Sequence, residues 1–409
     1  MEQLIDLENI RQDFPILQKK IRNKPYIYLD TSSSSLKPKP VIEELYHFYL
    51  HDYATVGRGN YDLTLAATKK FEETRHTIKE FLHAREEKEI IFTRGTTDSI
   101  NMMAFSLSEM HIKPGDEIIL SQIEHHANIV PWQMLARKKQ AKLKFIPINE
   151  KGELLLDEYK KLLSPKTKLV AITHMANSTG TINPVKEISK LAHEKGALVL
   201  VDGAQAIAHM KVDVQEIDAD FYVFSAHKMY GPNGVGVLYG KKEILDRLPP
   251  VQVGGGMIEK LSCQVASFQK IPGKFEAGTP PVAEIIAFKK AIEYLEKIGR
   301  KNIYLWEKKL LSYLTEKMEK IPYIKIIGTA KEKGGIISFI HTKFDVQKIG
   351  DLLNERGIAI RVGHHCAMPV LEFFKTTATA RISFGLYNTL EEMDSFTLNL
   401  EESLKELGN

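Results

Sequence analysis

The feature of this sequence that most constrains its fold is a regular alternation of short apolar runs and amphipathic stretches between about residues 89 and 240. Five runs have the apolar, β-branched character of strands buried on both faces, at residues 117–120, 168–173, 197–201, 221–224 and 235–239. Between them lie helical patterns, such as one that begins at Pro184 and ends before Gly196. Repetition of strand, helix and strand predicts βαβ crossovers, and therefore an α/β fold with a mostly parallel sheet.

A second set of elements follows a change of pattern at Pro249. The stretch from there to about residue 281 is predicted to be irregular, because prolines and three consecutive glycines interrupt it. Helices and strands are then predicted at residues 285–298, 302–320, 335–340, 346–356, 358–362 and 379–384. A final helix is expected from Thr389, which fits a capping box with Glu392. These elements predict a smaller C-terminal α+β domain, with a boundary near residue 290.

Composition and charge disfavour several classes of protein. The 409 residues carry a net charge of only +4, which is too small to favour nucleic acid as a partner. No apolar run reaches the about 18 residues that cross a membrane, and the acidic residues near Met1 argue against a targeting peptide. Two cysteines, Cys263 and Cys366, cannot cross-link a chain of this size, so a cytoplasmic protein with reduced thiols is expected.

The strongest chemical signal is the end of the apolar run at residues 221–224. Ser225, His227 and Lys228 follow it directly, just before a glycine-rich turn. A lysine desolvated at a strand end has a lowered pKa, which frees its amine for Schiff-base chemistry. A solvated lysine that merely leaves the strand fits the same pattern equally well.

A carboxylate is expected at the same edge of the sheet. Asp202 ends another buried run, 26 residues before Lys228, and open α/β sheets bind ligands at the carboxyl ends of their strands. Asp202 could cap the next helix, or it could keep a pyridinium nitrogen protonated, as pyridoxal phosphate requires.

Two further strand ends carry candidate ligand-binding groups. Thr96 and Thr97 follow Gly95 at a predicted helix start, where N–H groups and hydroxyls can bind phosphate, although ordinary helix caps look the same. His125 follows the run at 117–120 and could stack on a planar ring, shuttle a proton, or simply cap a helix.

The last signal is a thiol between imidazoles in a predicted loop. Cys366 follows His364 and His365, and a thiol in such surroundings can be a reactive thiolate. A zinc site is disfavoured, because three adjacent side chains do not easily converge on one tetrahedral ion and no second ligand pair has suitable spacing, so no metal is expected. Cys263 has no such neighbours and is interpreted as structural.

Taken together, these segments resemble a known family. Gly-Thr-Thr (95–97), Glu-His-His-Ala-Asn (124–128), Val-Asp-Gly-Ala-Gln (201–205), Ser-Ala-His-Lys (225–228) and Phe-Glu-Ala-Gly-Thr-Pro (275–280) occur in this order in class V aminotransferases. With Arg-Val-Gly-His-His-Cys-Ala-Met-Pro (361–369), the chain resembles the SufS-type cysteine desulfurases, the group that also includes selenocysteine lyases.

The resemblance implies a fold-type I pyridoxal-phosphate enzyme that forms a homodimer. It implies a large domain (26–290) with a mainly parallel seven-stranded sheet, a small domain (291–409), and an N-terminal segment (1–25) that packs with the small domain. The cofactor would bind Lys228 covalently. Its other predicted ligands are Asp202 at the pyridinium nitrogen, Gln205 at the ring oxygen, His125 stacked on the ring, Thr96, Thr97, Ser225 and His227 at the phosphate, and Thr279 from the other subunit. The substrate carboxylate would be held by Arg381, helped by Asn177 and Arg361.

The implied reaction converts L-cysteine to L-alanine and leaves its sulfur on Cys366 as a persulfide for iron–sulfur cluster assembly or other thiolation. Lys228 would take the Cα proton, and His125 is the candidate proton shuttle at sulfur. A selenocysteine lyase or another lyase of this scaffold is the nearest alternative. A non-enzymatic scaffold descendant is a third, disfavoured because Lys228, Asp202 and Cys366 are all present.

The chain departs from these relatives in four places, one of which is Asp98, where relatives have a glutamate after Gly-Thr-Thr. Thr31, Ser32 and Ser33 stand where relatives have Asn-Ala-Ala or Ser-Ala-Ala. The segment 57–61 keeps Arg58 but lacks two family histidines, and Phe344 replaces a histidine associated with a zinc-dependent sulfur acceptor. The resemblance implies a sulfur-acceptor protein, SufE-like or SufU-like, without identifying which, and Phe344 disfavours a zinc-dependent acceptor.

Overall fold

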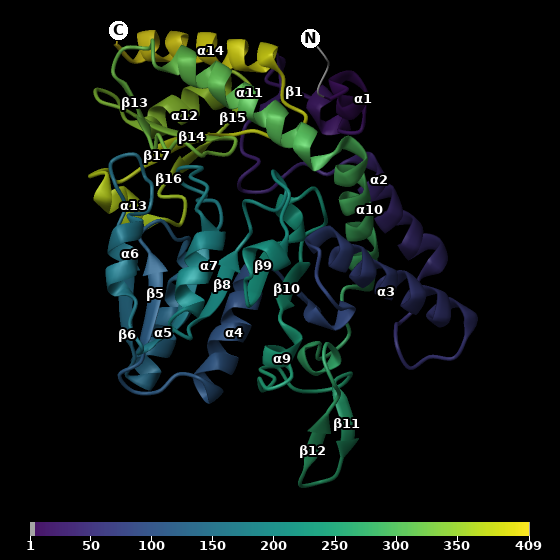
Figure 1. Cartoon of the computed structure of the whole chain (residues 1–409). Coiled ribbons are helices and arrows are strands. Elements are labelled where there is room, and N and C mark those ends of the chain that lie inside the picture. Colours follow the sequence, from purple (N-terminus) through teal and green to yellow (C-terminus); the bar gives the residue numbers. More distant parts are fainter. Residues whose placement is uncertain (1–4, 409) are drawn as a thin grey trace.

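The computed structural model describes residues 5–408, and its centre is a seven-stranded sheet with the order β4-β10-β9-β8-β7-β5-β6 (Figure 1). The strands are β4 (Ile90–Thr93), β5 (Glu117–Ser121), β6 (Lys142–Ile146), β7 (Thr167–Thr173), β8 (Leu198–Asp202), β9 (Phe221–Ser225) and β10 (Gly236–Gly240). The five predicted strands are confirmed, each to within one residue at either end. Neighbouring strands from β9 to β6 pair in parallel, while β10 runs antiparallel to both β9 and β4. The predicted α/β fold with a mainly parallel seven-stranded sheet is therefore confirmed.

Both faces of this sheet are covered, which explains the apolar runs that carried the prediction. Along β5, Ile118 and Leu120 face one apolar core and Ile119 faces the other, as the alternation of side chains in a strand requires. One core receives α4 and α5, and the other receives α3, α6, α7 and α10. These helices are α3 (Asp62–Leu82), α4 (Thr96–Met110), α5 (Val130–Lys139), α6 (Leu156–Leu162), α7 (Val185–His193) and α10 (Val282–Ile298).

A second, antiparallel sheet of four strands, with the order β13-β14-β17-β16, lies in the C-terminal part of the chain. Its elements are β13 (Ile324–Ile327), β14 (Ile336–His341), β16 (Arg361–Gly363), β17 (Thr379–Ser383), α11 (Arg300–Met318), α12 (Val346–Glu355), α13 (Met368–Phe373) and α14 (Leu390–Gly408). The predicted capping box is present, since the Glu392 N–H donates to Thr389 Oγ1 and the Thr389 N–H donates to Glu392 Oε2, both at 3.2 Å.

The prediction of one strand over residues 358–362 is wrong. The chain changes partners at Ile360, so that β15 (Ile358–Ala359) pairs in parallel with β3 (Ile27–Tyr28), whereas β16 pairs with β17. This pairing joins the beginning of the chain to its C-terminal part, where α1 (Leu7–Gln12) also contributes a 2.8 Å bond from Arg11 Nη1 to Glu392 Oε1. The division at residue 290 falls inside the continuous helix α10, and the domain limits stay a prediction.

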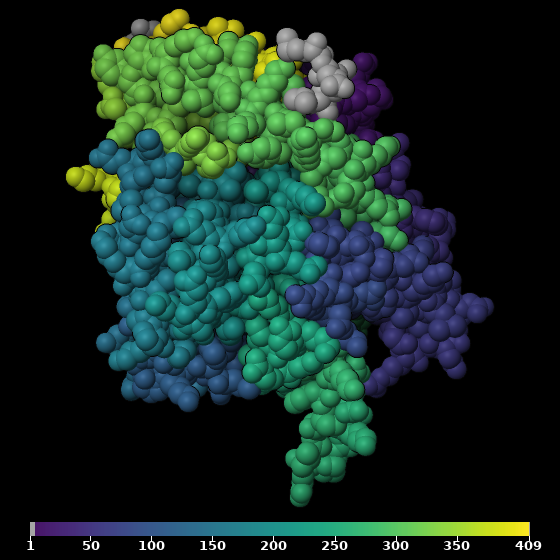
Figure 2. Space-filling view, viewed as in Figure 1, coloured from purple at the N-terminus to yellow at the C-terminus, as the bar shows by residue number. Residues whose placement is uncertain are grey.

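The stretch predicted to be irregular contains an antiparallel hairpin, β11 (Ile258–Leu261) and β12 (Ala266–Phe268). The hairpin projects from the body of the molecule at the bottom of Figure 2. Cys263 lies at its exposed tip, which does not agree with a structural role for this thiol. The other elements are β1 (Lys20–Ile21), β2 (Lys24–Pro25), α2 (Lys39–His47), α8 (Val214–Ile217) and α9 (Lys242–Leu245). Among residues 5–408, no helix is long and apolar enough to cross a membrane.

Candidate active site

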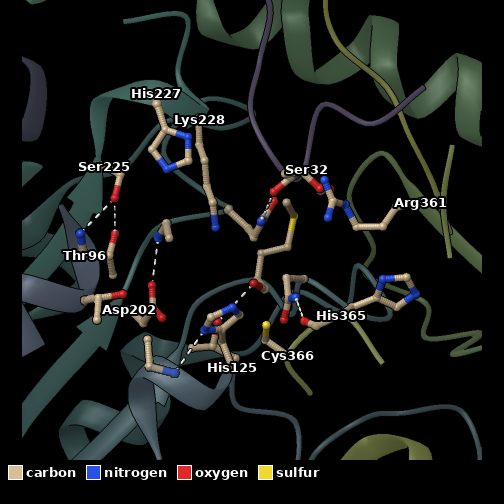
Figure 3. Close-up of a pocket in the computed structure, with 18 of the residues that line it drawn as sticks. Ser32, Thr96, His125, Asp202, Ser225, His227, Lys228, Arg361, His365 and Cys366 are labelled. Atoms are coloured by element: carbon tan, nitrogen blue, oxygen red, sulfur yellow. Dashed lines mark hydrogen bonds between the residues drawn. The ribbon is translucent and has the colours of Figure 1, made fainter. Parts of the chain in front are cut away.

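The carboxyl ends of the central strands and the loops of the C-terminal part enclose one cavity of about 350 Å³ (Figure 3). Twelve of the thirteen predicted site residues line it, namely Thr96, Thr97, His125, Asn177, Asp202, Gln205, Ser225, His227, Lys228, Arg361, Cys366 and Arg381. The structure thus brings these residues together, and their individual roles stay predictions. A cavity of this volume takes a ligand the size of a cofactor with a small substrate.

One end of the cavity is the N-terminus of α4. Its first N–H groups have no carbonyl partner within the helix, and the dipole of the helix attracts an anion there. The Thr96 N–H and hydroxyl both lie 2.8 Å from Ser225 Oγ, so β9 and α4 present their hydroxyls together. A Cβ atom at Gly236 would lie only 2.3 Å from Gly95 Cα, so this close contact between β10 and the loop before α4 requires glycine. This end of the cavity fits a phosphate group.

The middle of the cavity holds Lys228 and Asp202. Lys228 ends a short 3-10 helix after β9, and its amine points into the cavity (Figure 3). Burial lowers the pKa of Lys228, an effect that the Asp202 carboxylate partly offsets. Lys228 is partly exposed, and its side chain lines the cavity.

Asp202 is 4% exposed and receives one hydrogen bond, from the Ala204 N–H at 2.9 Å. Burial raises the pKa of Asp202, because few groups in the cavity compensate its charge. A buried carboxylate with so few partners is matched by a cationic ring nitrogen placed beside it.

His125 both caps a helical turn and lines the cavity. Its Nδ1 accepts the Ala127 N–H at 3.0 Å, so the capping alternative is correct without excluding a role at the ligand. Burial, helped by the neighbouring Lys228, lowers the pKa of His125 to about 3. The ring is therefore neutral near pH 7.

The buried His174, whose N–H donates to the Asp202 carbonyl at 2.8 Å, provides a pH-dependent test of the fold. Burial alone lowers its pKa from 6.5 to about 4, and its Nδ1 lies 3.1 Å from the Tyr222 hydroxyl. The unfolded chain then takes up a proton that the folded chain does not, so this group contributes stability above pH 6.5 that is lost as the pH falls toward 4. In His174→Gln, the difference in unfolding free energy between about pH 7.5 and about pH 5.5 should shift by roughly 1 kcal/mol toward stability at the lower pH. Urea unfolding of the protein without cofactor at both pH values measures it, and an unchanged difference would contradict the assignment.

Cys366 lies opposite Lys228 on a strained loop. His365 (φ 52°) and Cys366 (φ 53°) both have left-handed backbone conformations, which cost about 1–2 kcal/mol per residue. The loop is held by the His126 N–H, which donates to the Cys366 carbonyl at 2.7 Å, and by the Cys366 N–H, which donates to His364 Nδ1 at 3.0 Å. Strain of this kind is typical of active sites, where the surrounding structure imposes it.

An acid that the sequence did not indicate lies behind the arginine-lined end of the cavity, outside its lining. Asp30 accepts hydrogen bonds from both predicted carboxylate-binding arginines, from Arg361 Nη2 at 2.8 Å and from Arg381 Nη2 at 3.2 Å. Ser33 joins them, since its hydroxyl donates to Asp30 at 2.6 Å and accepts from Arg381 Nη2 at 2.7 Å. The departure from the family pattern at residues 31–33 marked this loop, but nothing in the sequence placed its residues at the arginines.

Thr279 is the predicted site residue that does not line the cavity. It is exposed and lies in a separate hollow with Arg94, Asp98 and Glu276. This position is compatible with a role in another subunit, which stays a prediction.

The fold and the cavity define the class of protein. A lysine at the end of a strand, a buried carboxylate on the neighbouring strand and a phosphate-binding helix start at the edge of a seven-stranded sheet are the arrangement of the fold-type I pyridoxal-phosphate enzymes. A sequence model of the aminotransferase class-V family matches residues 27–396.

The relatives narrow this class. A cysteine desulfurase of Cronobacter sakazakii is 44% identical, with 98% of this chain and 99% of that protein covered. A solved cysteine desulfurase of Thermococcus onnurineus NA1 superposes with a TM-score of 0.93 at 37% identity, covering 98% of each chain. A probable cysteine desulfurase of Mycolicibacterium paratuberculosis is 45% identical over 96% of this chain, which spans 58% of that protein's length. This chain belongs to the cysteine desulfurase family of class V aminotransferases.

Proposed function

We propose that this chain is a pyridoxal-phosphate-dependent cysteine desulfurase, in which L-cysteine and the thiol of Cys366 react to give L-alanine and a Cys366 persulfide. The single observation that carries the proposal is that Lys228 and Cys366 line one cavity, which has a phosphate-binding end and an arginine-lined end. The relatives named as cysteine desulfurases support the same reaction.

The residues present fit the cofactor. Thr96, Thr97, Ser225 and His227 would hold its phosphate at the start of α4, Lys228 would bind it covalently, and Gln205 and His125 would contact its ring. Asp202 would keep the ring nitrogen protonated, which would explain why a poorly compensated carboxylate is buried there. When bound, pyridoxal phosphate withdraws electrons from the substrate Cα and so makes its proton acidic.

Side chains of this protein orient the substrate, move protons and attack the substrate sulfur. Arg381, Arg361 and Asn177 orient the substrate carboxylate, and the Lys228 amine, with its lowered pKa, takes the Cα proton. The Cys366 thiolate then attacks the substrate sulfur. An S–S bond forms, the Cβ–S bond breaks, and its electron pair remains on Cβ. Protonation of Cβ and return of a proton to Cα then give alanine. His125, neutral near pH 7, carries the proton at sulfur.

We further propose a cytoplasmic homodimer of the SufS type that passes its sulfur to an acceptor protein, SufE-like or SufU-like, for iron–sulfur cluster assembly or other thiolation. In this dimer, Thr279 reaches the partner's phosphate site. An apolar surface next to the hollow that holds Thr279 supports the assembly, because Phe105, Val130 and Met134 on α4 and α5 are all more than 40% exposed. A second copy of this chain is the proposed occupant of that surface.

The test is incubation of the pure protein, loaded with cofactor, with L-cysteine. We expect one alanine for each sulfur released in the presence of a reductant, and an added mass of one sulfur on Cys366 in its absence. A parallel incubation with L-selenocysteine separates the two lyase activities. Absence of alanine from both substrates would overturn the proposal.

A further inference from the structure

The segment that carries Lys228 is held from outside the cavity by the loop between β3 and α2. The His227 carbonyl, which belongs to the peptide bond that precedes Lys228, accepts hydrogen bonds from several donors of this loop. These four donors are the Lys37 amine at 2.8 Å, the Ser35 N–H and hydroxyl, both at 3.1 Å, and the Ser34 hydroxyl at 3.2 Å. A carbonyl oxygen has two lone pairs, so the donors exceed what a peptide carbonyl ordinarily accepts.

The same loop also holds the other end of this segment. Tyr230, which follows Lys228 closely in the sequence, has a left-handed backbone conformation (φ 67°), which is uncommon for a residue with a bulky side chain. Its N–H donates to Ser35 Oγ at 2.7 Å, and the Ser35 hydroxyl in turn donates to the His227 carbonyl. The main chain is therefore fixed on both sides of the lysine. Backbone strain that the surrounding structure imposes in this way is typical of functional sites.

Lys37 is the charged donor in this arrangement. A hydrogen bond from an ammonium group is stronger than one from a hydroxyl or a peptide N–H. Burial lowers the pKa of Lys37 to about 8, and the amine's two hydrogen-bond partners among the described residues, the carbonyls of His227 and Ser35, carry no charge. Desolvating a cation without a carboxylate partner costs free energy. Because Lys37 does not line the cavity, this cost is explained by what its amine does at the His227 carbonyl.

We propose that Lys37 is a positioning residue for Lys228: by binding the His227 carbonyl, it fixes the main chain from which the reactive amine extends. This inference rests on the proposed function, in which the Lys228 amine holds the cofactor and moves the Cα proton. In each reaction cycle the amine must release the cofactor and later bind it again, whereas the main chain of Lys228 need not move. A fixed main chain limits the positions that the free amine can reach, and so favours both of these tasks.

The rate at which the cofactor attaches to Lys228 tests this proposal without requiring desulfuration. Pyridoxal phosphate is added to the protein without cofactor, the visible absorbance is followed over time, and borohydride reduction with peptide mapping identifies the attachment site. Lys37→Met should slow the attachment by about tenfold or more and lower kcat for alanine formation by a similar factor, because the amine is less well placed. The KM for L-cysteine should stay within about twofold of the wild type. A residue that only stabilises the fold would change the urea midpoint of unfolding and leave both rates of the folded protein unchanged.

Lys39→Met is the matched control. The Lys39 side chain is 59% exposed, and its amine lies 3.5 Å from Glu43 Oε1. This variant removes the same charge from a neighbouring position without affecting His227, so it should attach the cofactor at the wild-type rate. Ser35→Ala is a second test of the same arrangement. It removes the hydroxyl that contacts both sides of Lys228, so it should also slow the attachment.

The outcomes separate the two proposals. If the wild type forms no adduct on Lys228, the proposed function fails. If the adduct forms and Lys37→Met has the attachment rate and kcat of Lys39→Met, the positioning role is overturned. A raised KM with an unchanged kcat also overturns it, because Lys37 would then act on substrate binding. If Lys37→Met does not fold, Ser35→Ala decides, since an unchanged attachment rate in that variant contradicts the proposal.

Discussion

Replacing Cys366 by alanine is expected to abolish the persulfide and to lower alanine production from L-cysteine by at least about 100-fold, while the visible absorbance of the bound cofactor is retained. The thiol lies on a loop across the cavity from Lys228, and nothing else in the described cavity offers a sulfur nucleophile. The cofactor contacts proposed for Lys228, Asp202 and the start of α4 do not involve this loop. Absorbance spectra, alanine assays and intact-protein mass spectrometry measure the three quantities.

The chain provides its own control for this prediction. Cys263 is also a free thiol, but it lies at the exposed tip of the β11–β12 hairpin, outside the cavity. Cys263→Ala should therefore retain the mass increase and the alanine yield. A persulfide that persists in Cys366→Ala and disappears in Cys263→Ala would show that the wrong thiol has been assigned.

The second large effect is expected for Lys228→Ala, which should remove the covalent link to the cofactor and lower alanine production by at least about 1,000-fold. Both proposed tasks of this side chain, holding the cofactor and moving the Cα proton, depend on the same amine. Borohydride reduction of the protein loaded with cofactor, followed by peptide mapping, should place the cofactor on Lys228 in the wild type and leave no stable adduct in the variant.

Lys333 is a suitable control because it is another desolvated lysine. Burial lowers its pKa to about 7, yet it lies outside the cavity, with its amine at the Gly328 carbonyl. Lys333→Met should retain the adduct on Lys228. An adduct on Lys333 in the wild type would mean that a lowered pKa alone, without the position over Asp202, determines where the cofactor binds.

The parts of the fold that could be predicted are those in which buried residues form a recognisable apolar pattern along the sequence. Strands such as β8 and β9 are apolar at nearly every position, because both of their faces are covered. The edge strand β6 was missed, since Lys142 and Lys144 interrupt its apolar pattern. The β11–β12 hairpin was missed because it has no buried face, with Leu261 and Val265 at least 70% exposed.

The candidate site also contains residues that could be placed from the sequence and one that could not. Asp202, Ser225 and Lys228 could be placed together because parallel strands that end in polar residues bring them to one edge of the sheet. Asp30 could not, since its partners Arg361 and Arg381 follow 331 and 351 residues later. Only the folded chain shows that the two arginines share one acid.

The long separation in sequence between residues that meet at the cavity also determines when the active site is completed during synthesis. Two contacts join the loop that contains Asp30 and Ser32 to the final strand, β17. The Ser32 N–H donates to Ser383 Oγ, 351 residues away, and a β-bridge links Asp30 with Ser383. During translation, the strands of the central sheet and Lys228 are therefore synthesised long before the residues that complete the cavity. Because Arg381, the proposed ligand of the substrate carboxylate, lies on β17, substrate binding must follow translation of almost the whole chain.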